Sequence, residues 1–215
     1  MNFMKYVGLL LLLFSTSGSA QTLLPMSSLN AAPLNANADS TKQFDVYCDF
    51  RCPYCARLFS RLLAGARAEQ RTLDYRFLHF PFHSGSMEIA LFYEAAMSNY
   101  PDRRDSLIES LYKFRGQTGS DNFQRALTAL ATLHAMDEIR VRRDMRARDS
   151  ALTVSDSKRT AVALSVDATP TVFYRGQMIA LSEPEEIARF MLDHSPQTAG
   201  VLPKLTADDC PSCQK

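Results

Sequence analysis

The stretch Asp49-Phe50-Arg51-Cys52-Pro53-Tyr54-Cys55 joins a short apolar segment to a helical one. The residues before it, Phe44 to Cys48, are mostly apolar and aromatic, a composition that predicts a β-strand. From Pro53 onward, apolar residues recur at helical spacing, and proline is tolerated in the first turn of a helix. The two cysteines at 52 and 55 therefore open an amphipathic helix.

Two cysteines separated by two residues at the start of a helix are typical of thiol-disulfide chemistry. A thiolate is the species that attacks a disulfide, and the free backbone N–H groups at a helix N-terminus favour that form. We predict that Cys52 is the nucleophile, which forms a mixed disulfide with the substrate. Cys55 lies one turn further along the helix, so we expect it to be less accessible and to resolve that intermediate.

After the first helix, the chain predicts a second strand and then a long helical region. Thr72 to Phe80 alternates apolar and polar residues, and Pro81 closes this strand. Apolar stripes at helical spacing follow, which predict a helical insertion at about residues 84–160. Within it, Arg140 to Arg148 holds five arginines interleaved with acids, a pattern typical of a solvated helix face.

The last part of the domain returns to strands. Thr171–Tyr174 and Gln177–Leu181 flank Arg175-Gly176, which predicts a tight hairpin. Ser182, with Glu185 three residues later, predicts a capping box at the start of a final helix. The predicted order is strand, helix, strand, helical insertion, strand, strand and helix.

In this order, the motifs resemble the thioredoxin superfamily and, within it, the DsbA-like proteins. Residues 49–55 resemble the active-site segment of that family, and His79-Phe80-Pro81-Phe82 resembles the segment that leads into its helical domain. Ala168 to Tyr174, with Gly176, resembles its cis-proline strand. The resemblance covers about Phe44 to His194 and implies an α/β fold, namely a thioredoxin fold with an inserted helical domain.

The resemblance also implies roles for residues around the two cysteines. Pro53 and Tyr54 lie inside the motif and would contact the substrate. Pro170 matches the family's cis-proline, which would leave the backbone of Thr169 to pair with an extended substrate. Only about 5% of X-Pro bonds in folded proteins are cis, so this is a specific prediction.

Three features depart from the family's pattern. Many thioredoxin-like proteins have a buried acid six residues before the nucleophile, where this chain has Val46; the adjacent Asp45 should point to the opposite face. Cys48 shares the face of Val46, and we predict a buried, inert thiol, with a regulatory role as the alternative. In the polar tail, Cys210 and Cys213 predict a local disulfide or a disordered end, and alternatively a second redox pair.

The N-terminus is typical of an export signal. Lys5 is followed by an apolar core from Val7 to Phe14 and by the small residues Gly18-Ser19-Ala20. This core is too short to span a bilayer; a retained anchor is the alternative. Removing the signal takes one lysine from the 24 basic residues and none from the 23 acidic ones, which leaves a formal charge of zero. The charge gives no indication of a nucleic-acid partner.

The chain thus divides into four predicted parts. They are a signal peptide at 1–20, a flexible leader at 21–41, a thioredoxin-like domain at 42–205 and a tail at 206–215 with its Cys-Pro-Ser-Cys pair. Five cysteines are an odd number for an exported chain, so at least one is free or pairs with another molecule. The histidines, which we predict to lie at the surface or at segment ends, are His79, His83, His134 and His194.

The resemblance implies a periplasmic thiol:disulfide oxidoreductase that forms disulfides in exported proteins through Cys52 and Cys55. Such an enzyme needs no cofactor or metal. Its partners would be reduced or misfolded exported proteins and a membrane quinone-linked oxidase of the DsbB type, and we expect a monomer.

Other functions stay open at this stage. The chief alternative is a disulfide isomerase or reductase of the DsbG or DsbC type, because Cys-Pro-Tyr-Cys and a threonine before the cis-proline also resemble that branch. The short segment before Cys52 has no room for the N-terminal dimerisation domain of that branch. Remote alternatives are a zinc-binding structural protein, in which two cysteine pairs hold one ion, and a non-catalytic binding protein for unfolded chains.

Overall fold

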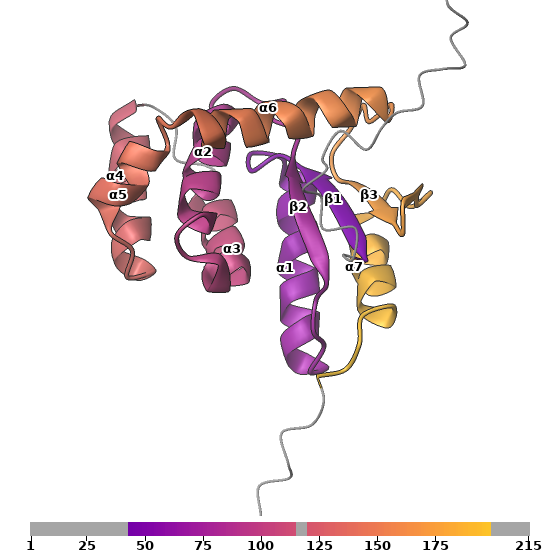
Figure 1. Ribbon diagram of the computed structural model, residues 1–215. Coiled ribbons are helices and arrows are strands. Elements are labelled where there is room, and N and C mark those ends of the chain that lie inside the picture. Colours follow the sequence, from indigo (N-terminus) through magenta and orange to yellow (C-terminus); the bar gives the residue numbers. More distant parts are fainter. Residues whose placement is uncertain (1–42, 115–119, 199–215) are drawn as a thin grey trace, which may run out of the picture. The chain divides into compact units, whose positions relative to one another are not determined.

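The computed structural model describes residues 43–114 and 120–198 (Figure 1). The elements in chain order are β1 (Phe44–Cys48), α1 (Pro53–Ala68), β2 (Tyr75–His79), α2 (Ser86–Met97), a 3-10 turn η2 (Pro101–Arg103), α3 (Arg104–Phe114), α4 (Ser120–Leu133), α5 (Glu138–Asp144), α6 (Arg148–Ala163), β3 (Thr171–Tyr174), β4 (Gln177–Met178) and α7 (Pro184–Asp193). The predicted signal peptide, leader and Cys210–Cys213 tail lie outside the described residues.

The four described strands form one sheet in the order β2-β1-β3-β4. β1 runs parallel to β2, because the chain crosses back through α1 between them, and antiparallel to β3. β3 and β4 form the predicted hairpin, in which Arg175 and Gly176 both have positive φ, at 50° and 80°. Two such residues suit the right-handed twist of the strands. β4 is shorter than predicted, since it ends at Met178 rather than near Leu181.

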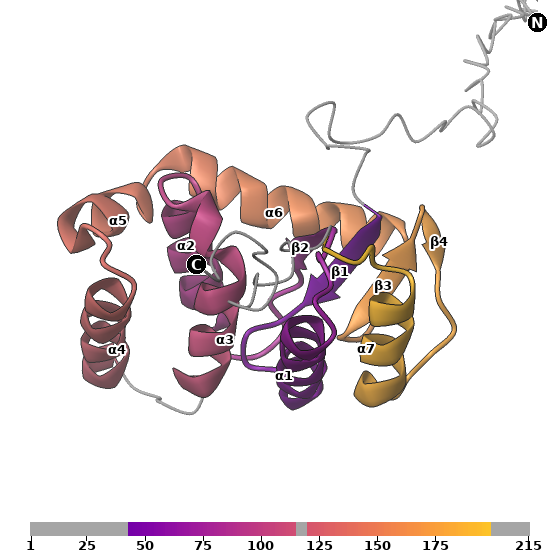
Figure 2. The same ribbon diagram turned by 90° about the horizontal axis from the view of Figure 1, so that it is seen from below.

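Helices cover both faces of this sheet. Figure 2 shows α1 and α7 on one face and α6 on the other. Val46 and Cys48 belong to the main core with α1 and α7, whereas Tyr47 packs with Phe173 and Ala161 of α6. The alternation of side chains along β1 therefore places Cys48 on the same face as α1.

The helices from α2 to α6 form the insertion between β2 and β3, and aromatic rings connect it to the sheet. Phe50, which follows β1, stacks on Phe77 of β2 with ring centroids 4.6 Å apart. Its ring also lies 5.4 Å from that of Tyr93 in α2 and 5.3 Å from that of Tyr112 in α3. Phe50, two residues before Cys52, is thus held by contacts with both the sheet and the helical insertion.

The start of α7 differs from the prediction. The residue that caps this helix is Glu183 rather than Ser182, and no side-chain hydrogen bond closes a capping box there. The reason is Pro184, which occupies the first helical position and keeps the residue before it extended, at φ −82° and ψ 127°.

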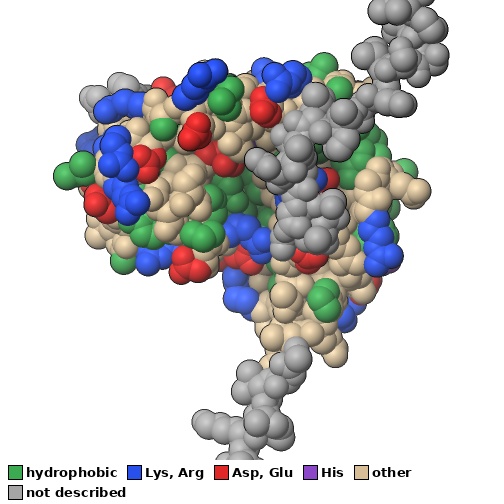
Figure 3. Space-filling view, in the orientation of Figure 1, with side chains coloured by type: hydrophobic (Ala, Val, Ile, Leu, Met, Phe, Trp, Pro, Cys, Tyr) green, Lys and Arg blue, Asp and Glu red, His purple; other side chains and the backbone are tan. Residues whose placement is uncertain are grey.

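The arginine-rich segment lies in and after α5, and Arg140 and Arg143 are exposed as predicted. Arg142 pairs with Glu138 at 2.7 Å, and Arg143 pairs with Asp144 at 2.8 Å. Figure 3 shows basic and acidic side chains interspersed over this side of the molecule. Among the helices of residues 43–114 and 120–198, none is long and apolar enough to cross a membrane.

Candidate active site

Cys52 caps the N-terminus of α1. Its backbone is extended, at φ −70° and ψ 123°, and its N–H donates to the carbonyl of Asp49 at 3.0 Å, which closes the turn after β1. Pro53 begins the helix, as its position in the sequence predicts. The Cys52 side chain therefore lies beside the first-turn N–H groups, which have no acceptor within the helix.

The segment before β3 comes close to this sulfur although it is far away in the sequence. The Thr169-Pro170 bond is cis, as predicted. The Cys52 thiol donates a hydrogen bond to the Thr169 carbonyl, with 3.2 Å between Sγ and oxygen. The resemblance predicts a Thr169 backbone that is free to pair with a substrate. In the structure, however, the Thr169 carbonyl oxygen accepts the hydrogen bond of the Cys52 thiol.

A shallow, largely apolar groove of ≈ 290 Å³ opens beside Cys52. Three of the predicted substrate-binding residues, Pro53, Tyr54 and Thr169, line it, but Pro170 is not among the lining residues. The remaining wall comes from Phe80, Phe82, His83, Asp167 and Ala168. Phe82 is 75% exposed and Tyr54 is 48% exposed, so two aromatic rings face solvent next to the sulfur.

Cys55 does not pair with Cys52 in this structure. It forms a disulfide with Cys48, with a Cα–Cα separation of 6.0 Å, and leaves Cys52 as a free thiol. The prediction that Cys48 is buried is confirmed, at 1% exposed, but the prediction that it is an inert thiol is wrong. Strand alternation and the first turn of α1 bring the two side chains to the same place beneath the motif.

Asp49, the first residue of the motif, is buried, and the sequence alone did not predict a role for it. One carboxylate oxygen accepts from the Arg51 N–H at 2.7 Å and from the Ser86 hydroxyl. The other accepts at 2.8 Å from each of three donors: the backbone N–H groups of Phe82 and His83 and the His83 ring. Asp49 thereby ties the turn that carries Cys52 to the loop that leads into α2.

The ionisation of Asp49 follows from these contacts. Burial alone would raise the pKa of the Asp49 carboxyl. The hydrogen bonds from the Ser86 hydroxyl, the His83 and Arg51 backbone and the His83 ring outweigh burial and hold its pKa below the usual value. A carboxylic acid that follows directly on a buried strand is the signal in the sequence that could have identified this role.

The neighbours of the motif on the sheet divide as alternation predicts. Val46 is fully buried in the core, and Asp45 points to the other face, where it pairs with Arg76 through two contacts of 2.6 Å. His79 lies at the end of a segment, as the last residue of β2, but it is buried rather than at the surface. It is 1% exposed, and its Nε2 lies 2.6 Å from a Glu94 carboxylate oxygen.

The family described as "Thioredoxin" matches residues 34–193. The chain belongs to the thioredoxin family. No curated protein matches the chain. The predicted enzyme class, a thiol-disulfide oxidoreductase, agrees with this family and with the Cys-x-x-Cys pair at the start of α1.

Several solved structures share the fold of this thioredoxin-family chain. Oxidised BdbD from Bacillus subtilis is 16% identical and has a TM-score of 0.59, with 73% of this chain and 88% of that chain covered. Reduced DsbA1 from Neisseria meningitidis is 16% identical with a TM-score of 0.56, over 72% and 83% of the two chains. A thioredoxin-like oxidoreductase from Silicibacter pomeroyi is 20% identical with a TM-score of 0.53, over 70% and 83%. The predicted DsbA-like thioredoxin fold with a helical insertion is confirmed.

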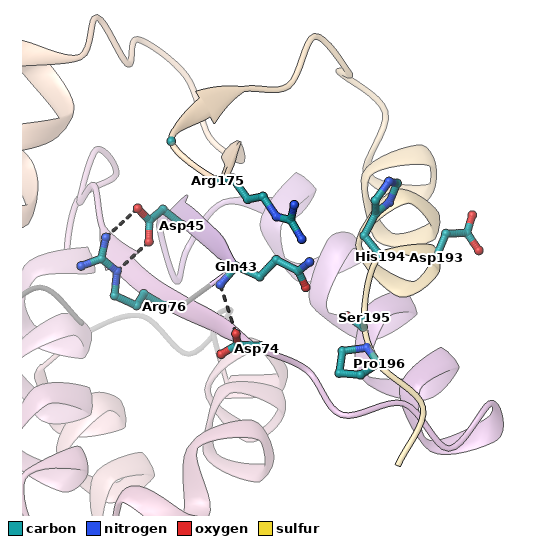
Figure 4. Close-up of a pocket in the computed structure, with 10 residues that line it drawn as sticks. Gln43, Asp45, Asp74, Arg76, Arg175, Asp193, His194, Ser195 and Pro196 are labelled. Atoms are coloured by element: carbon teal, nitrogen blue, oxygen red, sulfur yellow. Dashed lines mark hydrogen bonds and ion pairs between the residues drawn. The ribbon is translucent and has the colours of Figure 1, made fainter. Parts of the chain in front are cut away.

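A larger cavity of ≈ 880 Å³ lies at the opposite end of β1 from the thioredoxin-type motif (Figure 4). Its lining is polar and charged, and it includes Gln43, Asp45, Arg175 and His194. None of the described residues that line this cavity is a cysteine. Its position assigns the redox chemistry to the smaller groove beside Cys52.

Proposed function

We propose that the protein is a periplasmic thiol:disulfide oxidoreductase that forms disulfides in exported polypeptides. The observation that carries the proposal is the 3.2 Å contact between the sulfur of Cys52 and the Thr169 carbonyl, at the edge of an apolar groove. A nucleophilic sulfur whose thiol bonds a backbone carbonyl suits a polypeptide substrate, because that carbonyl becomes available to a main-chain amide of the substrate once Cys52 is in a disulfide.

The reaction uses the Cys52–Cys55 disulfide as the oxidant. A substrate thiolate attacks Cys52, and Cys55 leaves as a thiolate, which gives a mixed disulfide between substrate and enzyme. A second substrate thiolate then attacks the substrate sulfur of that bond and releases Cys52. The substrate gains one disulfide, and the enzyme ends with both motif cysteines reduced.

The groove supports a broad range of polypeptide substrates. Most of its lining is apolar, and its aromatic residues Tyr54, Phe80 and Phe82 offer contact area that does not depend on one substrate sequence. Phe82 is also held by its backbone, since its N–H donates to the buried Asp49. The contact surface beside Cys52 is therefore apolar and anchored.

Export and re-oxidation complete the proposal. The apolar segment from Val7 to Phe14 and the small residues after it support export to the periplasm. A reduced enzyme there requires an electron acceptor, and we propose a membrane quinone-linked oxidase of the DsbB type. We also propose a monomer.

The proposal is tested with cysteine variants and a reduced, unfolded model protein. The oxidised wild type should consume substrate thiols, whereas Cys52→Ser should fall to the uncatalysed rate. Cys55→Ser is the matched control: it keeps Cys52 but has no Cys52–Cys55 disulfide, so it should not oxidise the reduced substrate. Mixed instead with a disulfide-bonded model protein, its Cys52 thiolate should attack a substrate disulfide and accumulate a covalent complex that a reductant dissolves. A Cys52→Ser protein that still oxidises the substrate would contradict the proposal.

An isomerase or reductase is the second candidate. The observation that favours it is the free thiol at Cys52, because both activities begin with attack by a thiolate on a substrate disulfide. Alkylation of the protein in periplasmic extracts separates the candidates. A resting oxidase has Cys52 in a disulfide, and a resting isomerase or reductase has it free.

A further inference from the structure

Cys55 has two possible partners in this protein. Cys52 precedes it by one helical turn in the Cys-x-x-Cys pair, and Cys48 is bonded to it in the structure. We infer that Cys48 is a third redox-active cysteine, which exchanges with Cys52 for the bond to Cys55. This inference rests on the proposed thiol-disulfide activity of Cys52 and Cys55 and adds a second oxidised state to it.

The backbone holds Cys48 and Cys55 within bonding distance. Their Cα atoms are 6.0 Å apart, inside the usual range of about 4.4–6.8 Å for disulfides. Cys48 is the last residue of β1, and its carbonyl accepts from the Phe80 N–H at 3.0 Å. Cys55 is in the first turn of α1, on the face that packs against the sheet. Neither element has to move for this bond to exist.

The exchange is balanced without an external oxidant. The Cys48 thiolate attacks the Cys55 sulfur of the Cys52–Cys55 disulfide, the Cys48–Cys55 bond forms, and Cys52 leaves as a thiolate. One disulfide is present before and after the step, so nothing is oxidised or reduced overall. Cys48 loses a proton and Cys52 takes one up, so the number of protons does not change. The Cys52 thiol then makes its hydrogen bond to the Thr169 carbonyl.

The second state has a different activity because its disulfide is out of reach. Cys48 is 1% exposed and Cys55 is fully buried, so a substrate thiolate cannot attack their bond. Cys52 is itself only 4% exposed, but unlike the other two cysteines it lines the groove, and it does so as a thiol. It can attack a non-native disulfide of a bound polypeptide, which gives a mixed disulfide and releases one substrate thiolate. That thiolate attacks a second substrate disulfide, and the new thiolate that leaves attacks the substrate sulfur of the mixed disulfide and frees Cys52. This sequence rearranges disulfides without net oxidation.

The same chain would therefore serve as an oxidase with the Cys52–Cys55 bond and as an isomerase with the Cys48–Cys55 bond. The buried bond also keeps the oxidising equivalent inside the protein. When Cys52 attacks Cys55, the outer disulfide re-forms and Cys48 becomes a thiol again. Cys48 thus sets the fraction of oxidised molecules that present a nucleophile to the substrate.

Tryptic peptides distinguish the two disulfides. Trypsin cuts after Lys42, Arg51 and Arg57, so Cys48 falls in the peptide 43–51, and Cys52 and Cys55 share the peptide 52–57. The full chain is equilibrated in a glutathione buffer, quenched with acid and alkylated with N-ethylmaleimide in denaturant before digestion. A Cys48–Cys55 bond links the two peptides, with the label on Cys52. A Cys52–Cys55 bond stays within one peptide, with the label on Cys48.

We expect the linked species in the oxidised wild type, with the label on Cys52. A linked fraction below about one part in a hundred would overturn the inference, since it would place the second state more than two powers of ten below the first. Because this measurement uses the unmodified chain, it does not depend on whether a variant folds. The tail cysteines fall in a separate peptide after Lys204, so mispairing with them is recognised directly.

Activity tests the consequence. Without added reductant, the oxidised wild type should rearrange a scrambled disulfide substrate, whereas Cys48→Ala and Cys48→Ser should fall to the rate of the buffer. Val46→Ala is the matched control, since Val46 lies on the same strand and face, is fully buried and has no sulfur. Equal isomerase rates in the wild type and both Cys48 variants would refute the role of Cys48. Cys52→Ser then separates the two failures. If it also kept its exchange activity, the proposed function would be refuted. If it were inactive, only the inferred exchange between Cys48 and Cys52 would be refuted.

Discussion

Asp49→Asn is the substitution that most directly tests how the turn before Cys52 is held. The change keeps the size of the side chain and removes its charge. The Asp49 carboxylate acts only as an acceptor in its described hydrogen bonds. One oxygen accepts from the Arg51 N–H and the Ser86 hydroxyl, and the other accepts from the Phe82 N–H, the His83 N–H and the His83 ring. An asparagine side chain has only one acceptor oxygen.

The magnitude follows from the number of donors that lose their partner. The least costly orientation of the amide points its nitrogen at the Arg51 N–H and Ser86, because the serine hydroxyl can then accept. That orientation still leaves the Arg51 N–H unsatisfied and weakens the other three bonds. Hydrogen bonds to charged groups contribute about 1.5–3 kcal/mol each, so we expect a loss of about 3–5 kcal/mol in the free energy of unfolding.

The assay is urea unfolding of wild type, Asp49→Asn and a control, Asp45→Asn. Asp45 lies four residues earlier on β1, and its ion pair with Arg76 is about a quarter exposed. Exposed ion pairs are worth about 0–1 kcal/mol, so the control should lose far less. A loss at Asp49 no larger than the loss at Asp45 would refute the reasoning, because it would mean that the buried bonds do not hold the turn.

The pH dependence supplies an independent sign. A carboxyl whose pKa is lowered in the folded state stabilises the protein fully above its unfolded pKa, near 3.9, and loses that contribution as the pH falls through the folded value. The stability difference between wild type and Asp49→Asn should therefore be constant from about pH 7 to pH 5 and shrink below about pH 4. A difference that grows on acidification would contradict the assignment.

Two further substitutions separate binding from folding. Phe82→Ala removes a ring that is 75% exposed beside Cys52. It should raise KM for an unfolded polypeptide by about 2- to 13-fold, with little change in stability. Ile139→Ala, at a site that is 83% exposed on α5, is the control and should leave KM unchanged. Gly176→Ala should lower the unfolding free energy by about 1–2 kcal/mol, because φ is +80° there and alanine disfavours that conformation. No described atom lies within 4 Å of the added Cβ, so backbone strain is the whole cost. Gly176→Asn should lose less, since asparagine tolerates this conformation.

The sequence was sufficient to predict the elements that place the active site. β1 and the start of α1 could be predicted because an apolar run, a proline at the first helical position and the spacing of Leu58 and Leu62 all indicate the same boundaries. The hairpin at Arg175-Gly176 could be predicted because its turn requires residues that tolerate positive φ. These are local properties, and tertiary contacts did not override them.

Residues whose role depends on distant contacts could not be assigned in the same way. Asp49 and His79 are buried because donors and a carboxylate from α2 or the preceding loop reach them, and such partners leave no periodic pattern. The pairing of Cys48 with Cys55 requires both the inward face of β1 and the inward face of α1. Strand alternation predicted that Cys48 lies on the inward face of β1. The Cys-x-x-Cys spacing, however, predicted Cys52 as the partner of Cys55 rather than Cys48.

The hydrogen bond from Cys52 to the Thr169 carbonyl couples the release of the product to the oxidation state of one sulfur. The bond exists only while Cys52 bears a proton, so every disulfide of Cys52 leaves that carbonyl open to an amide of the bound polypeptide. When Cys52 is released as a thiol, it reclaims the acceptor, and the polypeptide loses one main-chain contact worth about 0.5–1.5 kcal/mol. In the proposed reaction, the finished chain would therefore be held more weakly than the reacting one and would dissociate about 2 to 13 times faster.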